Sequence, residues 1–191
     1  MKTWIYLIRH AESPFVLGEE EARGLSEKGR KDAKRVSEIL LREGIDVVIS
    51  SNYQRAIQTV QDLAESLGVA IRIQPDFRER TLAAQRITFD DFEEALRATF
   101  ADPDFAHPGG ESNREAAQRG VAALLRVLEE YPGKRIAIGI HGSLMTVIMG
   151  AFDPRYDFHF WKTTTMPDIY KLIFEEKQLL SVERLWEPLR S

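Results

Sequence analysis

Two basic side chains end a run of apolar residues near the start of the chain. Thr3 to Ile8 are mostly apolar, β-branched or aromatic, which predicts a strand covered on both faces, and Arg9 and His10 follow directly. An imidazole can act as a nucleophile or as a general acid or base, and a guanidinium binds phosphate or carboxylate oxygens. Two interpretations are open at this point: an incidental polar strand end, or half of a site for an anion.

Polar residues follow an apolar run at two further places. The run "DVVIS" precedes "SNYQRA", which puts Arg55 in the first turn of a predicted helix, and the run "KRIAIGI" precedes His141 and Gly142. If these runs are parallel strands, their carboxyl ends meet at the edge where open α/β sheets bind ligands. Each residue alone is more typical of a structural role. Two arginines, two histidines and nearby helix N-termini together favour a phosphate or carboxylate site.

Composition restricts the kinds of site that the chain can form. The 191 residues include no cysteine, which excludes disulfides, a thiol nucleophile and cysteine-ligated zinc. None of the four histidines has the spacing of metal ligands, so we expect no metal. The net charge of -4 argues against nucleic acid or an anionic membrane as the main partner. No signal peptide and no apolar run of about 20 residues is evident, and we expect a cytoplasmic protein.

Strand-like and helix-like segments alternate along the chain. Ser26 is a candidate N-cap for a helix that ends at Gly44, and a second helix is expected from about Tyr53 to Leu67. "VAIRI" and "KRIAIGI" read as strands, and "DIYKLIFEEKQLLSVERLW" reads as a hairpin. This order predicts an α/β fold with a mainly parallel central β-sheet, helices on both faces and a C-terminal antiparallel hairpin. We expect a single domain over residues 1–191.

The middle of the chain is less regular, and we expect a helical insertion at about residues 78–112. It contains one helix, "TFDDFEEALRATF", and a loop, "ADPDFAHPGGE". Ser112 and Glu115 form a capping box ahead of a long helix. A short apolar helix is expected over Leu144–Met149. The aromatic region Phe158–Met166 has two open interpretations: a wall of the site, or core packing.

Six segments resemble the histidine phosphatase superfamily, which includes the cofactor-dependent phosphoglycerate mutases. The segments are "LIRHAES", "GLSEKGRKDAKRV", "DVVISSNYQRAIQTV", "FRER", "HPGGES" and "IAIGIHGS". One short motif would be weak evidence, but six in family order, from residue 3 to about 174, are specific. One departure is Ala11, which stands where the family's arginine–histidine–glycine signature has glycine. Alanine there is strained only if the backbone φ is positive or the contact with phosphate is tight.

The resemblance implies phosphoryl transfer through a phosphohistidine on His10. Guanidinium groups and a protonated His141 would bind the three equatorial phosphate oxygens, and Glu79 would protonate the leaving oxygen. No metal or other cofactor is required, because cationic side chains supply the positive charge. The implied catalytic residues are His10, Glu79, His141, Arg9 and Arg55, and the implied phosphate-binding residues are Arg9, Arg55, His141 and Gly142.

Three functions remain open from the sequence. We expect a metal-independent phosphatase acting on a small phosphorylated substrate, because a mutase needs extra basic residues around its bisphosphate intermediate. After Arg80, the segment to Ala106 contains only Arg86 and Arg97 as basic residues. The alternatives are a phosphoglycerate mutase and a non-catalytic phosphate-binding module. The natural substrate is left open, and so is the role of the terminal hairpin, as an exposed sheet edge or as the interface of a homodimer.

Overall fold

One mixed sheet of six strands forms the centre of the protein in a computed structural model, which describes residues 1–189. The strand order is β3-β2-β4-β1-β5-β6. The strands are β1 (Lys2–Arg9), β2 (Val47–Ser50), β3 (Ile71–Ile73), β4 (Arg135–Ile140), β5 (Asp168–Glu175) and β6 (Gln178–Arg184). The first four are parallel, and β5 and β6 are antiparallel at one side of the sheet. The predicted fold class is therefore confirmed.

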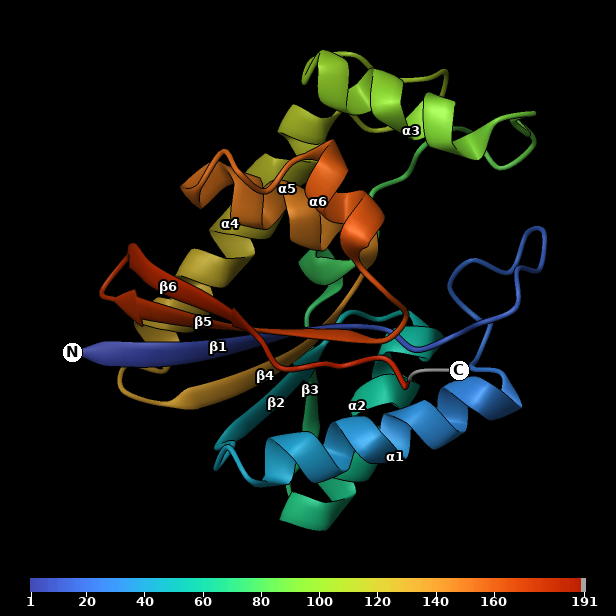
Figure 1. The fold of residues 1–191 in the computed structure, drawn as a ribbon. Helices are drawn as coiled ribbons and strands as arrows, with labels where there is room; N and C mark the ends of the chain where they lie inside the picture. The colour runs from blue at the N-terminus through green and yellow to red at the C-terminus, as the bar shows by residue number, and fades with distance from the viewer. Residues whose placement is uncertain (190–191) are drawn as a thin grey trace.

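Helices cover both faces of this sheet (Figure 1). One face carries α1 (Glu27–Leu41) and α2 (Gln54–Leu67). The other face carries α4 (Asn113–Glu130), α5 (Gly142–Phe152) and α6 (Phe158–Thr163), and α3 (Phe92–Ala101) lies beyond them. Each helix among residues 1–189 is too short or too polar to cross a membrane.

The predicted helix ends have the expected chemistry. The Ser26 side chain accepts a hydrogen bond from the Gly29 amide, and Gly68, with a φ of 66°, ends α2 in the left-handed conformation. Both hydrogen bonds of the Ser112–Glu115 capping box are present at the start of α4. These local signals depend on one or two turns of chain, which explains why the sequence reveals them.

Three helices differ from the sequence-based expectation. The predicted helix "TFDDFEEALRATF" begins only at Phe92, because the Asp91 side chain caps it there. The predicted short helix over Leu144–Met149 extends to Gly142–Phe152, and its residues 142–149 are all buried. A helix buried on all sides has no amphipathic period from which its ends can be read. The short helix α6 was not predicted. It begins after Asp157, whose carboxylate accepts the Phe160 amide, and its single turn and a half is too short to show periodicity.

The core lies on both faces of the sheet, and β1 contributes to each. Ile5 and Leu7 pack with α4 and α5, whereas Tyr6 and Ile8 pack with α1 and α2. All four side chains are fully buried. Successive side chains of β1 point to opposite faces of the sheet, as in any strand. Because helices cover both faces, both sets of side chains are apolar, which accounts for the continuous apolar run in the sequence.

The sheet register brings the ends of three strands together. Arg9 at the end of β1 pairs with Ile140 at the end of β4, and Ser50 at the end of β2 pairs with Gly139. The residues that follow these strands therefore leave the sheet at one edge, on the right in Figure 1. The predicted meeting of the strand ends is confirmed, and it positions the candidate site.

Candidate active site

His10 follows β1 and is buried at this edge. Its Nδ1 lies 2.7 Å from the carbonyl oxygen of Ala11. Because a carbonyl only accepts hydrogen bonds, this contact places the ring proton on Nδ1 and leaves the lone pair on Nε2. Arg55 Nε donates to Nε2 over 3.3 Å, which is a long hydrogen bond. Nε2 is therefore the nitrogen that can act as a nucleophile once this weak contact is replaced.

The surroundings of His10 keep its imidazole neutral. Burial lowers its pKa well below the usual value, and the positive charge of Arg55 lowers it further. The hydrogen bond to Ala11 acts in the opposite direction but is a smaller effect. A neutral imidazole is the form that attacks phosphorus, so the environment favours the nucleophilic state at neutral pH.

Arg9 is held between a threonine and the start of α5. Its Nη1 donates to Thr164 Oγ1 over 2.7 Å, and its buried Nε has no hydrogen-bond partner among residues 1–189. A Cβ at Gly142 would lie only 2.7 Å from the guanidinium carbon of Arg9. Glycine at this position therefore lets the guanidinium lie against the N-terminus of α5, with one buried N–H group that has no partner among residues 1–189.

His141 faces the ring of His10, with the two ring centroids 5.3 Å apart. Its Nε2 lies 2.7 Å from Ser51 Oγ, and its buried Nδ1 has no partner within the described chain. If the Ser51 hydroxyl donates to Nε2, Nδ1 carries the proton and can donate to an anion. His141 Nδ1 and Arg9 Nε are thus two buried nitrogen atoms of the site without a hydrogen-bond partner among residues 1–189.

Without a ligand, the surroundings of His141 disfavour the protonated ring, whereas its protonation beside a bound phosphate stays a prediction. The ring is fully buried, and burial lowers its pKa well below the usual value. The charge of Arg55 is the second cause, followed by His10 and Arg23. The sequence did not show how much positive charge is already gathered here, which makes a further cation unfavourable.

Arg55 is almost completely buried and is bound by a loop that follows β1. Its Nη1 donates to the backbone oxygen of Glu20 and its Nη2 to the Glu20 carboxylate, each over 2.5 Å. The second carboxylate oxygen lies 3.4 Å from Arg23 Nε. Glu20 therefore bridges two arginines. Sequence analysis missed Glu20 and Arg23, because they lie in an aperiodic loop whose only signal was the charged run "GEEEARG".

Glu79 lies at the N-terminus of α5, directly beyond His141. Its Oε2 accepts the Ser143 amide over 3.1 Å, and its Oε1 accepts the Leu144 amide over 2.9 Å. The N-terminal end of a helix favours a negative charge, and the Glu79 carboxylate takes the place of an N-cap there. The structure thus brings Glu79 to the same edge as the other predicted site residues.

The Arg119 side chain of α4 holds the loop that carries Glu79. The Arg119 guanidinium donates to the backbone oxygens of Asp76, Arg78 and Glu79, over 2.7, 2.9 and 3.2 Å. It also forms an ion pair with Glu111 at 2.6 Å. Three carbonyls of an irregular segment are satisfied by one side chain, and this explains how a stretch without periodicity holds Glu79 in place. Sequence analysis missed Arg119.

Ala11 is accommodated without backbone strain. Among residues 1–189, the only non-glycine residue with positive φ is Glu176, so Ala11 has an ordinary backbone conformation. The Ala11 amide donates to Thr59 Oγ1 over 2.9 Å, and its methyl group is buried in a small cluster with Leu25 and Ala33. The position therefore does not require the conformational freedom of glycine.

The aromatic region after α5 contributes mainly to packing. Phe158 is buried, and Phe160 packs against the core cluster of α4 and α5. The Trp161 ring lies between α6 and α3, with centroid distances of 5.8 Å to Phe158 and 6.4 Å to Phe92. The core interpretation of this region therefore holds for its phenylalanines, whereas Trp161 links α6 to the outer helix.

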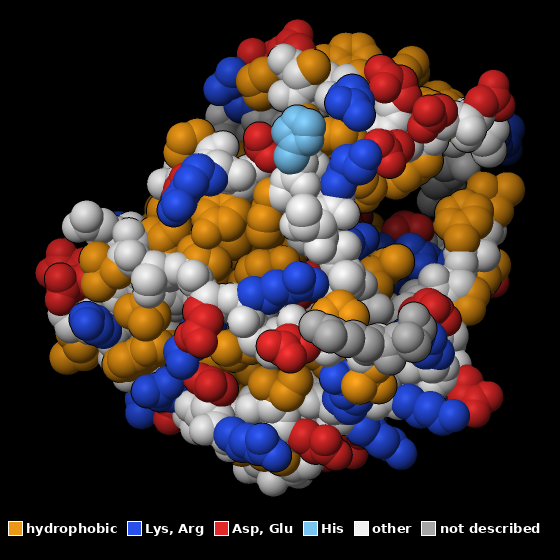
Figure 2. Space-filling view, viewed as in Figure 1, with side chains coloured by type: hydrophobic (Ala, Val, Ile, Leu, Met, Phe, Trp, Pro, Cys, Tyr) orange, Lys and Arg blue, Asp and Glu red, His pale blue; other side chains and the backbone are white. Residues whose placement is uncertain are grey.

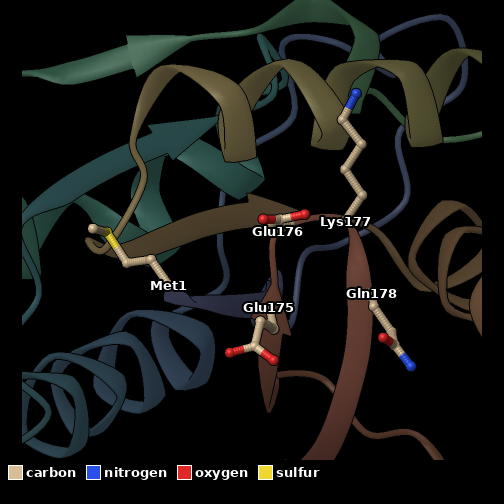
Figure 3. Close-up of a pocket in the computed structure, with 5 residues that line it drawn as sticks. All are labelled: Met1, Glu175, Glu176, Lys177 and Gln178. Carbon is tan, nitrogen blue, oxygen red and sulfur yellow. The ribbon is translucent and has the colours of Figure 1, made fainter.

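The surface is hollowed between α3 and the loop after β1 (Figure 2). Basic and acidic side chains are visible deep in this hollow, and hydrophobic side chains gather on its outer side. A second hollow, at the opposite end of β1, is lined by Met1 and residues 175–178. Its side chains point in different directions, and Lys177 forms an ion pair with Glu129 at 2.6 Å (Figure 3). Only the first hollow has convergent polar groups. Within residues 1–189, no three His, Asp or Glu side chains are grouped as metal ligands.

Comparison with known proteins identifies the family. A family model of the histidine phosphatase superfamily, branch 1, matches residues 5–182. The chain is 29% identical, over 161 residues, to a Cronobacter sakazakii protein named probable phosphoglycerate mutase GpmB, covering 76% of this chain and 74% of the relative. It is 28% identical, over 162 residues, to an uncharacterized phosphatase, PhoE, of Bacillus subtilis, covering 80% of each chain.

Solved structures have the same fold at low sequence identity. A mycobacterial glucosyl-3-phosphoglycerate phosphatase superposes with a TM-score of 0.77 and 20% identity, over 97% of this chain and 98% of that one. A phosphoserine phosphatase mutant from Entamoeba histolytica, in complex with phosphoserine, gives a TM-score of 0.75 and 17% identity, over 94% and 96%. Since the family model spans nearly the whole sequence, this chain belongs to the histidine phosphatase superfamily, branch 1.

Proposed function

We propose that this protein is a metal-independent phosphatase that hydrolyses small-molecule phosphomonoesters through a phosphohistidine on His10. The observation that carries the proposal is the state of that imidazole. Burial disfavours its charged form, its Nδ1 is held by the Ala11 carbonyl, and its Nε2 contacts Arg55, whose N–H groups suit phosphate oxygens. This arrangement prepares one nitrogen for attack and provides the charge that the reaction needs.

The first step transfers the phosphoryl group to the protein. His10 Nε2 forms a bond to phosphorus while the bond from phosphorus to the ester oxygen breaks. Arg9 Nε and His141 Nδ1 are buried and unpartnered among residues 1–189, and they would donate to phosphate oxygens together with Arg55. These groups and the N-terminus of α5 stabilise the charge of the transition state, which is the task of a metal ion in other phosphoryl-transfer enzymes.

Glu79 would handle the proton in both steps. In the first step it gives a proton to the departing ester oxygen, so that an alcohol leaves. In the second step it accepts a proton from the water that attacks phosphorus, the bond from Nε2 to phosphorus breaks, and inorganic phosphate is released. The position of its carboxylate, on the α5 amides that follow His141, stabilises the ionised form that accepts the proton in the second step.

The outer segment supports a phosphatase rather than a mutase. Of the three arginines in residues 80–106, Arg80 is buried and donates to Thr99 and Asn113. Arg97 pairs with carboxylates of its own helix, at 3.3 Å from Glu94. Few cations are therefore available to hold a second phosphate. A phosphoglycerate mutase remains the second candidate, because relatives near 30% identity carry that name.

Phosphate release from p-nitrophenyl phosphate tests the proposal. The wild-type protein is expected to release phosphate equally with and without EDTA, and His10→Ala is expected to lose at least about 1,000-fold of this activity. His159→Ala is the matched control, because His159 is exposed on α6. Unchanged release by His10→Ala, in a variant shown by circular dichroism to be folded, would refute the mechanism.

A second assay separates phosphatase from mutase. Interconversion of 3- and 2-phosphoglycerate is measured with added bisphosphoglycerate, beside phosphate release from the same samples. We expect phosphate release to be the faster reaction. Faster interconversion would assign the protein to the mutases, and strong inhibition by EDTA would contradict metal independence.

A further inference from the structure

We propose that Glu20 sets the substrate specificity of this site, by excluding phosphate esters whose leaving group carries a carboxylate. The substrates are then monophosphate esters with a neutral or cationic leaving group. This inference rests on the proposed phosphatase activity and deepens it, because it names the class of ester that the site accepts.

The first argument is the position of the Glu20 carboxylate. It lies 2.5 Å from Arg55 Nη2 and 3.4 Å from Arg23 Nε, and Arg55 also contacts the nucleophilic nitrogen of His10. A phosphate held by Arg55 and His10 is therefore separated from the Glu20 carboxylate by one guanidinium group. The Glu20 side chain is 41% exposed, so it faces the open side of the site rather than the core.

The second argument is the charge of the site. Three arginines, Arg9, Arg23 and Arg55, act on the two buried histidines, and two carboxylates, Glu20 and Glu79, act on Arg55. Arg80 interacts with Glu79 as well, and its side chain donates only to the uncharged Thr99 and Asn113. These six groups carry a net charge of +2. A phosphate dianion changes the total to 0, so no net positive charge remains for a second anion on the substrate.

Neighbouring cations do not change this balance. Arg78 lies on the Glu79 loop, but it is 3.7 Å from the Asp76 carboxylate and donates to the Pro75 carbonyl. Asp168 acts on Arg9 from the other side, and it is paired with Arg184 at 2.9 Å. Each of these charges already has an opposite charge beside it.

The third argument is the apolar character of the surface around the hollow. Phe15 and Leu17, on the loop that carries Glu20, are 72% and 64% exposed, and Phe92 on α3 is 57% exposed. These segments lie on opposite sides of the hollow in Figure 2, above a charged floor. A leaving group that emerges there meets apolar side chains and several carboxylates, including those in the first turn of α3. This favours an uncharged or cationic group over an anionic one.

A pair of substrates that differ at one carbon tests the inference. 3-Phosphoglycerate and glycerol 3-phosphate share the phosphate and the three-carbon chain, and only the first has a carboxylate. The wild-type protein is expected to have the higher kcat/KM for glycerol 3-phosphate. Glu20→Gln keeps the backbone contact to Arg55 and removes the charge, and it is expected to shift the kcat/KM ratio toward 3-phosphoglycerate by about tenfold or more.

Glu19→Gln is the matched control. It removes the same charge one residue away, from an exposed side chain, and is expected to change the ratio by less than about twofold. If Glu20 only holds Arg55 in place, Glu20→Gln lowers both kcat/KM values equally, and the unchanged ratio overturns the inference. A wild-type preference for 3-phosphoglycerate also overturns it.

Binding distinguishes failure of this inference from failure of the proposed function. If the wild-type protein hydrolyses neither these esters nor p-nitrophenyl phosphate, the phosphatase proposal fails. The dissociation constants of the two esters, measured by calorimetry on the wild type and on Glu20→Gln, still compare their selectivity. The role of Glu20 is supported if the wild type binds glycerol 3-phosphate more tightly than 3-phosphoglycerate and Glu20→Gln reduces this selectivity about tenfold. Equal changes in the dissociation constants of both ligands contradict it.

Discussion

Replacing Ala11 by glycine should make the protein less stable without making it more active. Glycine is the usual residue at this position in the family, so the variant restores the signature of the first motif. Ala11 is fully buried, has an ordinary backbone conformation and donates its amide to Thr59. The methyl group therefore fills space in the cluster with Leu25 and Ala33 and introduces no strain that glycine would relieve.

Two contributions give the expected magnitude of this destabilisation. Removing one buried methyl group costs about 0.8 kcal/mol, and the greater freedom of glycine in the unfolded chain costs about 0.4–1 kcal/mol. The free energy of unfolding should fall by about 1–2 kcal/mol. For a chain of this length, that change lowers the melting temperature by about 2–8 °C.

Urea unfolding and steady-state kinetics on Ala11→Gly provide the assay. The midpoint should move to lower urea with an unchanged slope, while kcat/KM for p-nitrophenyl phosphate stays equal or falls. Ala33→Gly is a control for loss of a buried methyl group in the same cluster, although it lies within α1 and adds a cost to the helix. A rise in kcat/KM or in stability for Ala11→Gly would refute the reasoning, because it would mean that the methyl group crowds the phosphate.

Two further predictions follow from the contacts of the buried site. Thr164→Val removes the oxygen that accepts from Arg9 and should lower kcat/KM about 10–100-fold, whereas Thr164→Ser keeps it and should stay within about threefold. Burial lowers the pKa of His10 and His141, so the unfolded chain binds protons first as the pH falls below about 6.5. The free energy of unfolding then falls on acidification, by up to about 1.4 kcal/mol per pH unit for each histidine. Urea unfolding at pH 7 and pH 5.5 should show a smaller fall for His141→Gln than for the wild type. An equal fall in both proteins would contradict a buried neutral ring.

The sequence predicted those parts of the site that regular structure determines. Arg9, His10 and His141 follow apolar runs, and Arg55 lies five residues after the end of β2, so the ends of parallel strands bring them together. Strand periodicity and the position of ligands in α/β sheets are general physical rules, and they hold here without knowledge of the rest of the chain.

The parts that were missed lie in irregular segments or depend on burial. Glu20 and Arg23 belong to a loop without periodicity, and Thr164 follows a helix too short to predict. Arg80, in the charged run "FRER", is 3% exposed and is bound by two buried polar groups, although such a run usually indicates a solvated loop. Charge in a sequence reveals neither its partner nor its burial, which are set by contacts between distant segments.

The difference between regular and irregular segments bears on how the substrate can be found. In the proposed mechanism, residues at strand ends bind the phosphate; the sheet holds them in place, and they would serve any phosphomonoester alike. The leaving group would contact Glu20 and exposed apolar residues of the loop after β1 and of α3, which no periodic pattern specifies. A comparison of substrates therefore tests the role of these segments only if all of them are phosphate monoesters. Their leaving groups should differ first in charge and then in apolar surface. A preference that follows size but not charge would assign the selection to Phe15, Leu17 and Phe92 rather than to Glu20.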